Sequence, residues 1–167
     1  MKRRDFIKAS ALGATVPASM LVSCSSVNSK IKTNKDNPII LSTWAHGLPA
    51  NVAALKALEK NGNAMDAAEA GARNSEEDPL NTSVGLGGLP DEKGLVTLDS
   101  CVMDHTGNCG SVAFLQNIKH PVSVARKVME DTKHVMLVGE GARQFAISKG
   151  FQEMDLLTEE SKKAWEK

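Results

Sequence analysis

The stretch from Leu80 to Gly94, LNTSVGLGGLPDEKG, constrains the fold most, because it separates a predicted helix from two predicted strands. A phosphate-binding loop follows a strand and opens a helix, which is the reverse of this order. The glycines also lack the G-x-G-x-x-G spacing, and no Lys-Ser or Lys-Thr pair follows them. We therefore expect Gly85, Gly87 and Gly88 to form a structural loop, where glycine permits positive φ and close backbone approach.

Two predicted helices and an apolar segment precede this loop. Residues 37–44 are rich in Ile and Leu and predict a buried strand. Apolar residues at helical spacing predict a helix over 49–62. Asn63 is the expected N-cap of a second helix over 64–78, which Pro79 ends.

Strands and helices alternate after the loop. Residues 95–104 and 109–115 predict two strands joined by a tight turn at Thr106-Gly107. The remaining pattern predicts a helix, a short strand and two more helices, over 121–131, 134–139, 140–150 and from an N-cap at Thr158 onward. The mixture indicates an α+β or related fold with helices packed on sheet.

Cys101 and Cys109 flank the predicted turn. If Asp104 pairs with Cys109, then Cys101 lies opposite Val112, and the two thiols point to opposite faces of the ribbon. We therefore expect no disulfide between them. Their spacing matches no zinc motif either, and we expect no metal site.

The first 24 residues predict an export signal rather than part of the fold. A basic head containing Arg3 and Arg4, followed by a moderately apolar stretch, resembles the twin-arginine export signal of bacteria. LVSC, residues 21–24, resembles a lipoprotein processing box, in which Cys24 carries the lipid and becomes the new N-terminus. A simple cleaved signal peptide, with Cys24 incidental, is the alternative. The expected location is periplasmic, or membrane-anchored by a lipid on Cys24.

Composition bounds the remaining chain. Residues 25–37 form a polar linker, so the folded part is expected over 38–167, which has room for one domain. The net charge of +0 gives no electrostatic reason to expect nucleic acid. Aromatic residues make up 4% and Tyr is absent, so the core must consist of Val, Leu, Ile, Ala and Met.

Six motifs in this region occur in one collinear order. They are STW at 42–44, SVGLGGLPD at 83–91, LDSCVMD at 98–104, GSVA at 110–113, HPVSVARKVME at 120–130 and HVMLVGEGA at 134–142. Together they resemble the α-subunit of the glycosylasparaginases (aspartylglucosaminidases), a family of N-terminal-nucleophile hydrolases. The resemblance implies a four-layer αββα sandwich, α+β in class, of which this chain is the N-terminal half.

The resemblance also implies a mechanism. The precursor cleaves itself into two chains, and cleavage frees a threonine at the start of the β-subunit. The hydroxyl of that threonine attacks the amide carbon of N-glycosylated asparagine, and its own α-amino group is the base. The implied partners are the β-subunit and the glycosylated substrate, in a heterotetramer of two α and two β chains. No cofactor or metal is implied.

The nucleophile is expected outside this chain. In the family it follows a His-Asp pair, and none of the eight threonines here has that context. DHTG at 104–107 permutes the letters but lies in a predicted turn, where Asp and Gly are expected on local grounds. We therefore expect no catalytic residue in this chain and no activity without the β-half. An asparaginase or isoaspartyl peptidase of the same superfamily, and a truncated non-catalytic exported protein, are the alternatives.

One pocket residue carries over from the resemblance. Trp44 corresponds to the family's tryptophan at the end of the first strand, which borders the substrate pocket. Its small neighbours Thr43 and Gly47 suit a pocket wall. Ordinary core packing of Trp44 is the alternative.

Overall fold

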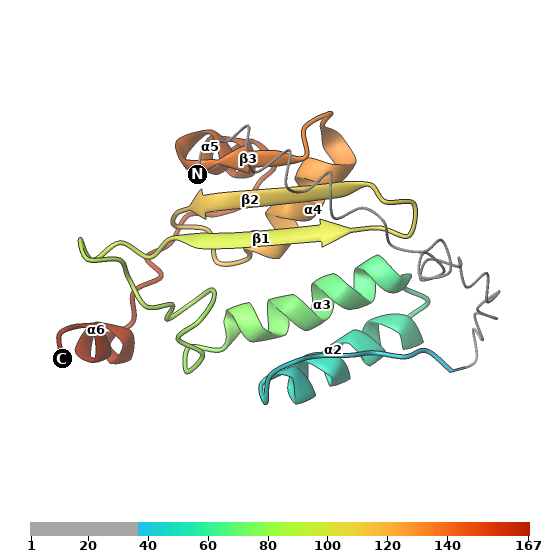
Figure 1. Cartoon of the computed structure of the whole chain (residues 1–167), viewed down its shortest axis with the longest axis horizontal. Helices are drawn as coiled ribbons and strands as arrows, with labels where there is room; N and C mark the ends of the chain where they lie inside the picture. Colours follow the sequence, from blue (N-terminus) through green and yellow to red (C-terminus); the bar gives the residue numbers. More distant parts are fainter. Residues whose placement is uncertain (1–36) are drawn as a thin grey trace, which may run out of the picture. The chain divides into compact units, whose positions relative to one another are not determined.

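The computed structural model describes residues 37–167, and Figure 1 shows their fold. The predicted export signal, with the lipidation candidate Cys24, and nearly all of the predicted linker lie outside the described residues. The folded unit runs from Ile39 to Lys167. Within the described part of the chain, no helix combines the length and the apolar character that crossing a membrane requires.

Two neighbouring helices run in opposite directions beside the sheet (Figure 1). The sequence predicted both of them. Helix α2 spans Gly47–Glu59 and helix α3 spans Ala64–Glu77. Asn63 caps α3 as expected, because its side chain accepts backbone N–H groups of the first turn while the Asp66 carboxylate accepts the N–H of Asn63. Small residues let the two helices approach closely, since a β-carbon at Gly71 would lie 3.1 Å from the carbonyl oxygen of Ala50.

The sheet has three strands in the order β1-β2-β3. The strands β1 (Leu98–Met103) and β2 (Cys109–Leu115) form the predicted antiparallel hairpin. Strand β3 (Met136–Val138) runs parallel to β2, which requires a crossover connection. Helix α4 (Pro121–Asp131) makes that crossover and lies behind the sheet in Figure 1. Two further helices follow, α5 (Gly139–Ser148) and α6 (Glu159–Trp165), the latter capped by Thr158 as predicted.

The core lies between one face of the sheet and the helices that cover it. Its residues are aliphatic, as the composition predicted: Val102, Val112, Leu115, Ile118, Val122, Val124, Ala125, Val128, Ala142 and Ala146. Methionines lie at its border, where Met65 and Met129 pack against it. One face of the sheet is thus covered by helices.

The other face of the sheet is open in the described part of the chain. Met103, Met136 and Val138 expose 67%, 52% and 55% of their surface. Successive side chains along a strand point to opposite faces of the sheet. The strand residues that alternate with these exposed ones therefore point into the core. The described residues therefore form one sheet with helices on one side, an α+β arrangement.

The strand predicted over residues 37–44 is wrong. These residues have no regular structure, and Ile39 and Leu41 expose 85% and 89% of their surface. A strand needs a partner with which to share backbone hydrogen bonds. This segment runs instead along the helical pair, away from the edges of the sheet (Figure 1).

The predicted register of the hairpin is also wrong, by one residue. Cys109 pairs with Met103 rather than with Asp104, and Cys101 pairs with Ser111. Asp104 belongs to the turn, because its N–H donates to the Asn108 carbonyl and its own carbonyl accepts the N–H of Gly107. A shift of one residue reverses the relative facing of side chains. Both thiols therefore lie on the open face of the sheet, and both are free.

Candidate functional site

Trp44 lies in the segment before α2 and exposes 73% of its surface. It borders a groove of about 290 Å³ between residues 40–47 and the small-residue faces of α2 and α3. The floor of this groove is made of Ala50, Ala54, Ala67, Ala68, Gly71 and Ala72. Trp44 is therefore not a core residue of the described fold, and its indole is accessible.

A tight turn fixes where Trp44 emerges. The carbonyl oxygen of Trp44 accepts the N–H of Gly47 at 2.8 Å, and that of Ala45 accepts the N–H of Leu48 at 3.2 Å. Gly47 is buried, and a β-carbon there would overlap the Ser42 side chain. The sequence STWAHG thus folds back directly into α2 and holds the tryptophan at the start of that helix.

The glycine-rich loop is tied to two other parts of the chain. Gly85 and Gly87 have φ of 63° and 85°, a region that favours glycine. The N–H of Leu86 donates to the Glu76 carbonyl and the N–H of Gly87 to the Leu156 carbonyl, each at 2.8 Å. Gly88 packs closely as well, since a β-carbon there would lie 3.2 Å from the Val96 side chain. These contacts fix the path of the loop between α3 and β1.

Glu76 and His120 form a buried polar pair that the sequence analysis missed. Glu76 is 4% exposed and His120 is 9% exposed. One carboxylate oxygen of Glu76 lies 3.2 Å from His120 Nδ1, and the other accepts the N–H of Val122 at 3.0 Å. That N–H belongs to the first turn of α4, where a negative charge is favourable. Glu76 therefore joins the end of α3, the glycine-rich loop and the start of α4.

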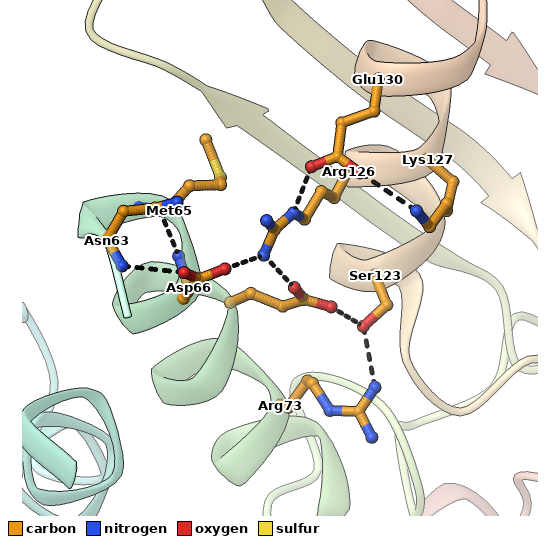
Figure 2. Close-up of polar contacts among 9 residues, drawn as sticks. Asn63, Met65, Asp66, Arg73, Ser123, Arg126, Lys127 and Glu130 are labelled. Carbon is orange, nitrogen blue, oxygen red and sulfur yellow. Dashed lines mark hydrogen bonds and ion pairs between the residues drawn. The ribbon is translucent and has the colours of Figure 1, made fainter. Parts of the chain in front are cut away.

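A network of charged side chains joins α3 to α4, as Figure 2 shows. The Arg126 guanidinium donates to Asp66 and Glu69 at 2.7 Å each and to Glu130 at 2.6 Å. Ser123, which is 4% exposed, accepts a hydrogen bond from Arg73 and donates a short one to Glu69. A hollow of about 440 Å³ lies beside the network.

The electrostatics of the network are those of satisfied ion pairs. Hydrogen bonds from the Asn63 N–H and from Arg126 hold the pKa of Asp66 below its usual value. The hydrogen bond from Arg126 lowers the pKa of Glu130 in the same way, against the opposing effect of partial burial. Partial burial alone would lower the pKa of Arg126, but its carboxylate partners outweigh this and raise it. Asp66 and Glu130, whose pKa values are lowered, thus form ion pairs with Arg126, whose pKa is raised, and the pair with Asp66 holds α3 against α4.

Thr106 serves the hairpin turn. Its hydroxyl donates to the Asp104 carboxylate at 2.7 Å, and its N–H donates to the same oxygen at 2.8 Å. These hydrogen bonds, the Thr106 hydroxyl foremost, lower the pKa of Asp104 to about 2. The Asp104 carboxylate accepts from the N–H of Asn108 as well, so it closes the turn from both sides. DHTG is a turn sequence.

Two further properties bear on chemistry within residues 37–167. No group of three or more His, Cys, Asp or Glu side chains is arranged there to hold a metal ion. Every buried side-chain nitrogen or oxygen there has a hydrogen-bond partner. The described fold therefore offers an exposed tryptophan beside a groove and an open sheet face, and its buried polar groups have hydrogen-bond partners.

Comparison with known proteins extends the sequence resemblance. The sequence model of the asparaginase family matches residues 25–167. N(4)-(Beta-N-acetylglucosaminyl)-L-asparaginase of Elizabethkingia miricola is 51% identical over 98% of this chain and 48% of its own length. The protein of that name from Rattus norvegicus is 43% identical over 75% of this chain and 36% of its own length. Plant-type L-asparaginase of Thermococcus kodakarensis is 44% identical over 64% of this chain and 35% of its own length.

These matches cover only part of the length of each relative. This chain spans about half the length of the first of these relatives and about a third of the other two. The match with the family's sequence model extends along the whole described fold, and the match with the first relative covers 98% of the chain.

Proposed function

Because this chain belongs to the asparaginase family, within the glycosylasparaginases of the N-terminal-nucleophile hydrolases, we propose that it is the α-half of an enzyme that cleaves glycosylated asparagine. The bond broken is the amide between the asparagine side chain and N-acetylglucosamine. The observation that carries this proposal is the match with the Elizabethkingia miricola relative along 98% of the chain.

In this proposal a β-half supplies the nucleophile. A threonine hydroxyl at its N-terminus attacks the side-chain amide carbon, and the threonine's α-amino group takes the proton. The glycosylamine leaves as the acyl-enzyme forms, and water then releases aspartate. In this proposal the present chain binds and positions the substrate.

The open face of the sheet supports the need for a second half. Exposed apolar residues such as Met136 and Val138 cost free energy in water, about 25 cal/mol per Å² of apolar surface. We propose that a second sheet, contributed by the β-half, covers this face and completes the four-layer αββα sandwich. The exposed apolar segment over 39–44 then finds the strand partner that the described residues do not offer.

We assign Trp44 to the wall of the substrate pocket. Its exposure and its place at a tight turn leave the indole free to contact a ligand. Replacing Trp44 with Leu should raise KM for glycosylated asparagine roughly tenfold or more and leave stability nearly unchanged, because little of the side chain is buried. The matched control is Trp165→Leu, at a tryptophan that packs on Gly94 far along the chain. An unchanged KM in the Trp44 variant would remove it from the pocket.

A second candidate function is hydrolysis of free asparagine or of β-aspartyl peptides. The likeness to the plant-type L-asparaginase favours it. Aspartate release from the glycosylated, free and β-aspartyl substrates separates the two, with this chain co-expressed with a β-half such as that of the Elizabethkingia miricola relative. A kcat/KM for the glycosylated substrate at least tenfold above the others is the expected result. The reverse order would assign the chain to the second function.

Export, lipidation and assembly belong to the same proposal. The basic N-terminus and the LVSC sequence support delivery across the cytoplasmic membrane, with Cys24 lipidated or removed. The assembled enzyme is a heterotetramer of two α and two β chains. A non-catalytic exported protein remains the alternative, and it predicts that no β-half accompanies this chain.

A further inference from the structure

A hollow of about 310 Å³ lies where α3, the residues directly before α4 and the loop after α5 meet. We call it the His120 hollow. No residue of a strand lines it, so it lies apart from the open sheet face that the proposed β-half would cover. Four of its lining residues have ionisable side chains, namely Arg73, Glu77, Lys119 and His120.

His120 presents one ring nitrogen to this hollow. The Glu76 carboxylate lies 3.2 Å from Nδ1, and because a carboxylate only accepts hydrogen bonds, Nδ1 carries the proton of the neutral ring. Nε2 makes no hydrogen bond within residues 37–167, where no buried side-chain nitrogen lacks a partner. Nε2 therefore reaches solvent, and the hollow that His120 lines is where it does so. When the ring gains a second proton, Nε2 becomes a hydrogen-bond donor.

Arg73 brings a guanidinium with free donors. Among the arginines in the described part of the chain, Arg126 and Arg143 form ion pairs and Arg73 forms none. Arg73 Nη1 donates to Ser123 Oγ at 2.9 Å, and the Ser123 hydroxyl donates in turn to Glu69 (Figure 2). This contact fixes one corner of the guanidinium, while Nε and Nη2 make no hydrogen bond with the described residues. A guanidinium held in this way presents a planar fork that matches two oxygens of an anion.

Lys119 and Glu77 complete the charged lining. Lys119 Nζ pairs with one carboxylate oxygen of Glu77 at 2.7 Å, and Glu77 exposes 63% of its side chain. The hydrogen bond from Lys119 is the main reason that the pKa of Glu77 is lowered, and the charges of His120 and Arg73 lower it further. Three groups that can carry positive charge therefore surround one exposed carboxylate. Exposed ion pairs contribute little to stability, so Lys119 can exchange Glu77 for a bound anion.

We propose that the His120 hollow binds the phosphate group of a small phosphate ester between Arg73, Lys119 and protonated His120. A carboxylate offers only two oxygens, whereas these three side chains supply donors for three or more. The Glu76 carboxylate lies on the other side of the imidazolium and balances its charge, so the anion and a proton bind together. Phe151 lines the same hollow and suits the organic part of an ester. The site is independent of the proposed amidase activity, and its test needs no β-half.

The test measures anion binding to the monomer fraction of the full chain by titration calorimetry. Sulfate is the first probe, because it stays a dianion across the range in which an imidazole titrates. We expect one sulfate per chain, with an affinity that falls at least tenfold between about pH 5.5 and about pH 8 as the imidazolium of His120 loses a proton. Acetate should bind at least tenfold more weakly than sulfate, and phenyl phosphate at least threefold more tightly than free phosphate.

Two substitutions should change the affinity in opposite directions. Lys119→Gln should lower it roughly tenfold, and Glu77→Gln should raise it roughly threefold, because the second removes the acidic side chain that competes with the anion. Lys149→Gln is the matched control, since Lys149 also pairs with a carboxylate, that of Asp131, and lies outside the hollow. It should bind as the parent does.

A sulfate titration followed by NMR needs no variant and so guards against misfolding. The ring signals of His120 should shift with sulfate, while those of the exposed His105 and His134 stay in place. The proposal is overturned by a lack of sulfate binding, by an affinity that changes neither with pH nor in Lys119→Gln, or by shifts at another histidine alone. Equal affinities for phenyl phosphate and free phosphate would contradict the ester as the ligand.

Discussion

The carboxylate of Glu76 lies 3.2 Å from Nδ1 of His120, and both side chains are buried. The pair joins residues that are 44 positions apart in the chain. Because the second carboxylate oxygen caps the start of α4 at Val122, one side chain satisfies two buried donors. The same residue's carbonyl oxygen accepts the N–H of Leu86 and so anchors the glycine-rich loop.

Replacing Glu76 with Ala should therefore destabilise the fold by about 2–4 kcal/mol, since it leaves buried polar groups unpaired. The effect should be local as well: amide hydrogen exchange over residues 120–126 should become faster. Glu77→Ala is the control, because Glu77 is exposed and pairs at the surface with Lys119, a contact worth less than about 1 kcal/mol. Equal exchange in the two variants would show that Glu76 does not cap α4.

Gly85→Ala should cost more than about 2 kcal/mol. Its φ of 63° disfavours a β-carbon by about 1–2 kcal/mol, and a β-carbon there would also overlap the Glu76 carbonyl. Gly107→Ala separates the backbone strain of a positive φ from the crowding around the β-carbon. Gly107 has a φ of 89°, and nothing lies within 4 Å of an added β-carbon. Urea unfolding of both variants measures the difference. A Gly107 variant that loses as much as the Gly85 variant would show that crowding at the loop contributes nothing.

The network around Arg126 should make the fold sensitive to acid. The pKa values of Asp66 and Glu130 are lowered in the fold, so their contribution to stability is present above their unfolded pKa values of 3.8 and 4.5 and is lost as the pH falls through the folded values. Arg126→Gln should lower stability at pH 7 by about 1–3 kcal/mol and flatten the decline below pH 4.5. Urea unfolding across this pH range, with Lys133→Gln as the exposed control, provides the measurement. A decline as steep in Arg126→Gln as in the parent would exclude the network as its source.

The isolated chain should associate or aggregate through its open sheet face. An exposed strand edge and an apolar face invite contact with other chains. Val138→Lys, at a position that exposes 55% of its surface, should raise the monomer fraction in light scattering after gel filtration, since the charge opposes association. Val135→Lys is the control outside the strands. A monomeric parent with one sharp, cooperative thermal transition would contradict this expectation.

Much of this fold follows from local sequence signals. Asn63 and Thr158 cap their helices as the sequence predicts, and Gly107 closes the predicted turn, because these choices depend on residues within a few positions. The segment over 37–44 was predicted wrongly for a physical reason: an apolar run specifies burial, whereas a strand also needs a partner. The face of the sheet to which Cys101 points depends on which residues of the two strands pair next to the turn. The hydrogen bonds of the Asp104 side chain set that pairing.

Less of the candidate site than of the fold could be predicted from the sequence. Trp44 was identified through a family resemblance, and the structure adds its exposure and the turn that holds it. The pairing of Glu76 with His120 could not be predicted, because nothing local links two residues 44 positions apart. The only hints were an acidic helix end and a histidine directly before the proline that opens α4.

The central claim is that this chain is the α-half of an N-terminal-nucleophile amidohydrolase. The most direct test is the mass spectrum, under denaturing conditions, of the protein purified from its own cells. We predict two chains, of which the second begins with threonine, together with a first chain that starts at or near Cys24. A single chain that ends at Lys167, with no companion beginning with threonine, would contradict the claim.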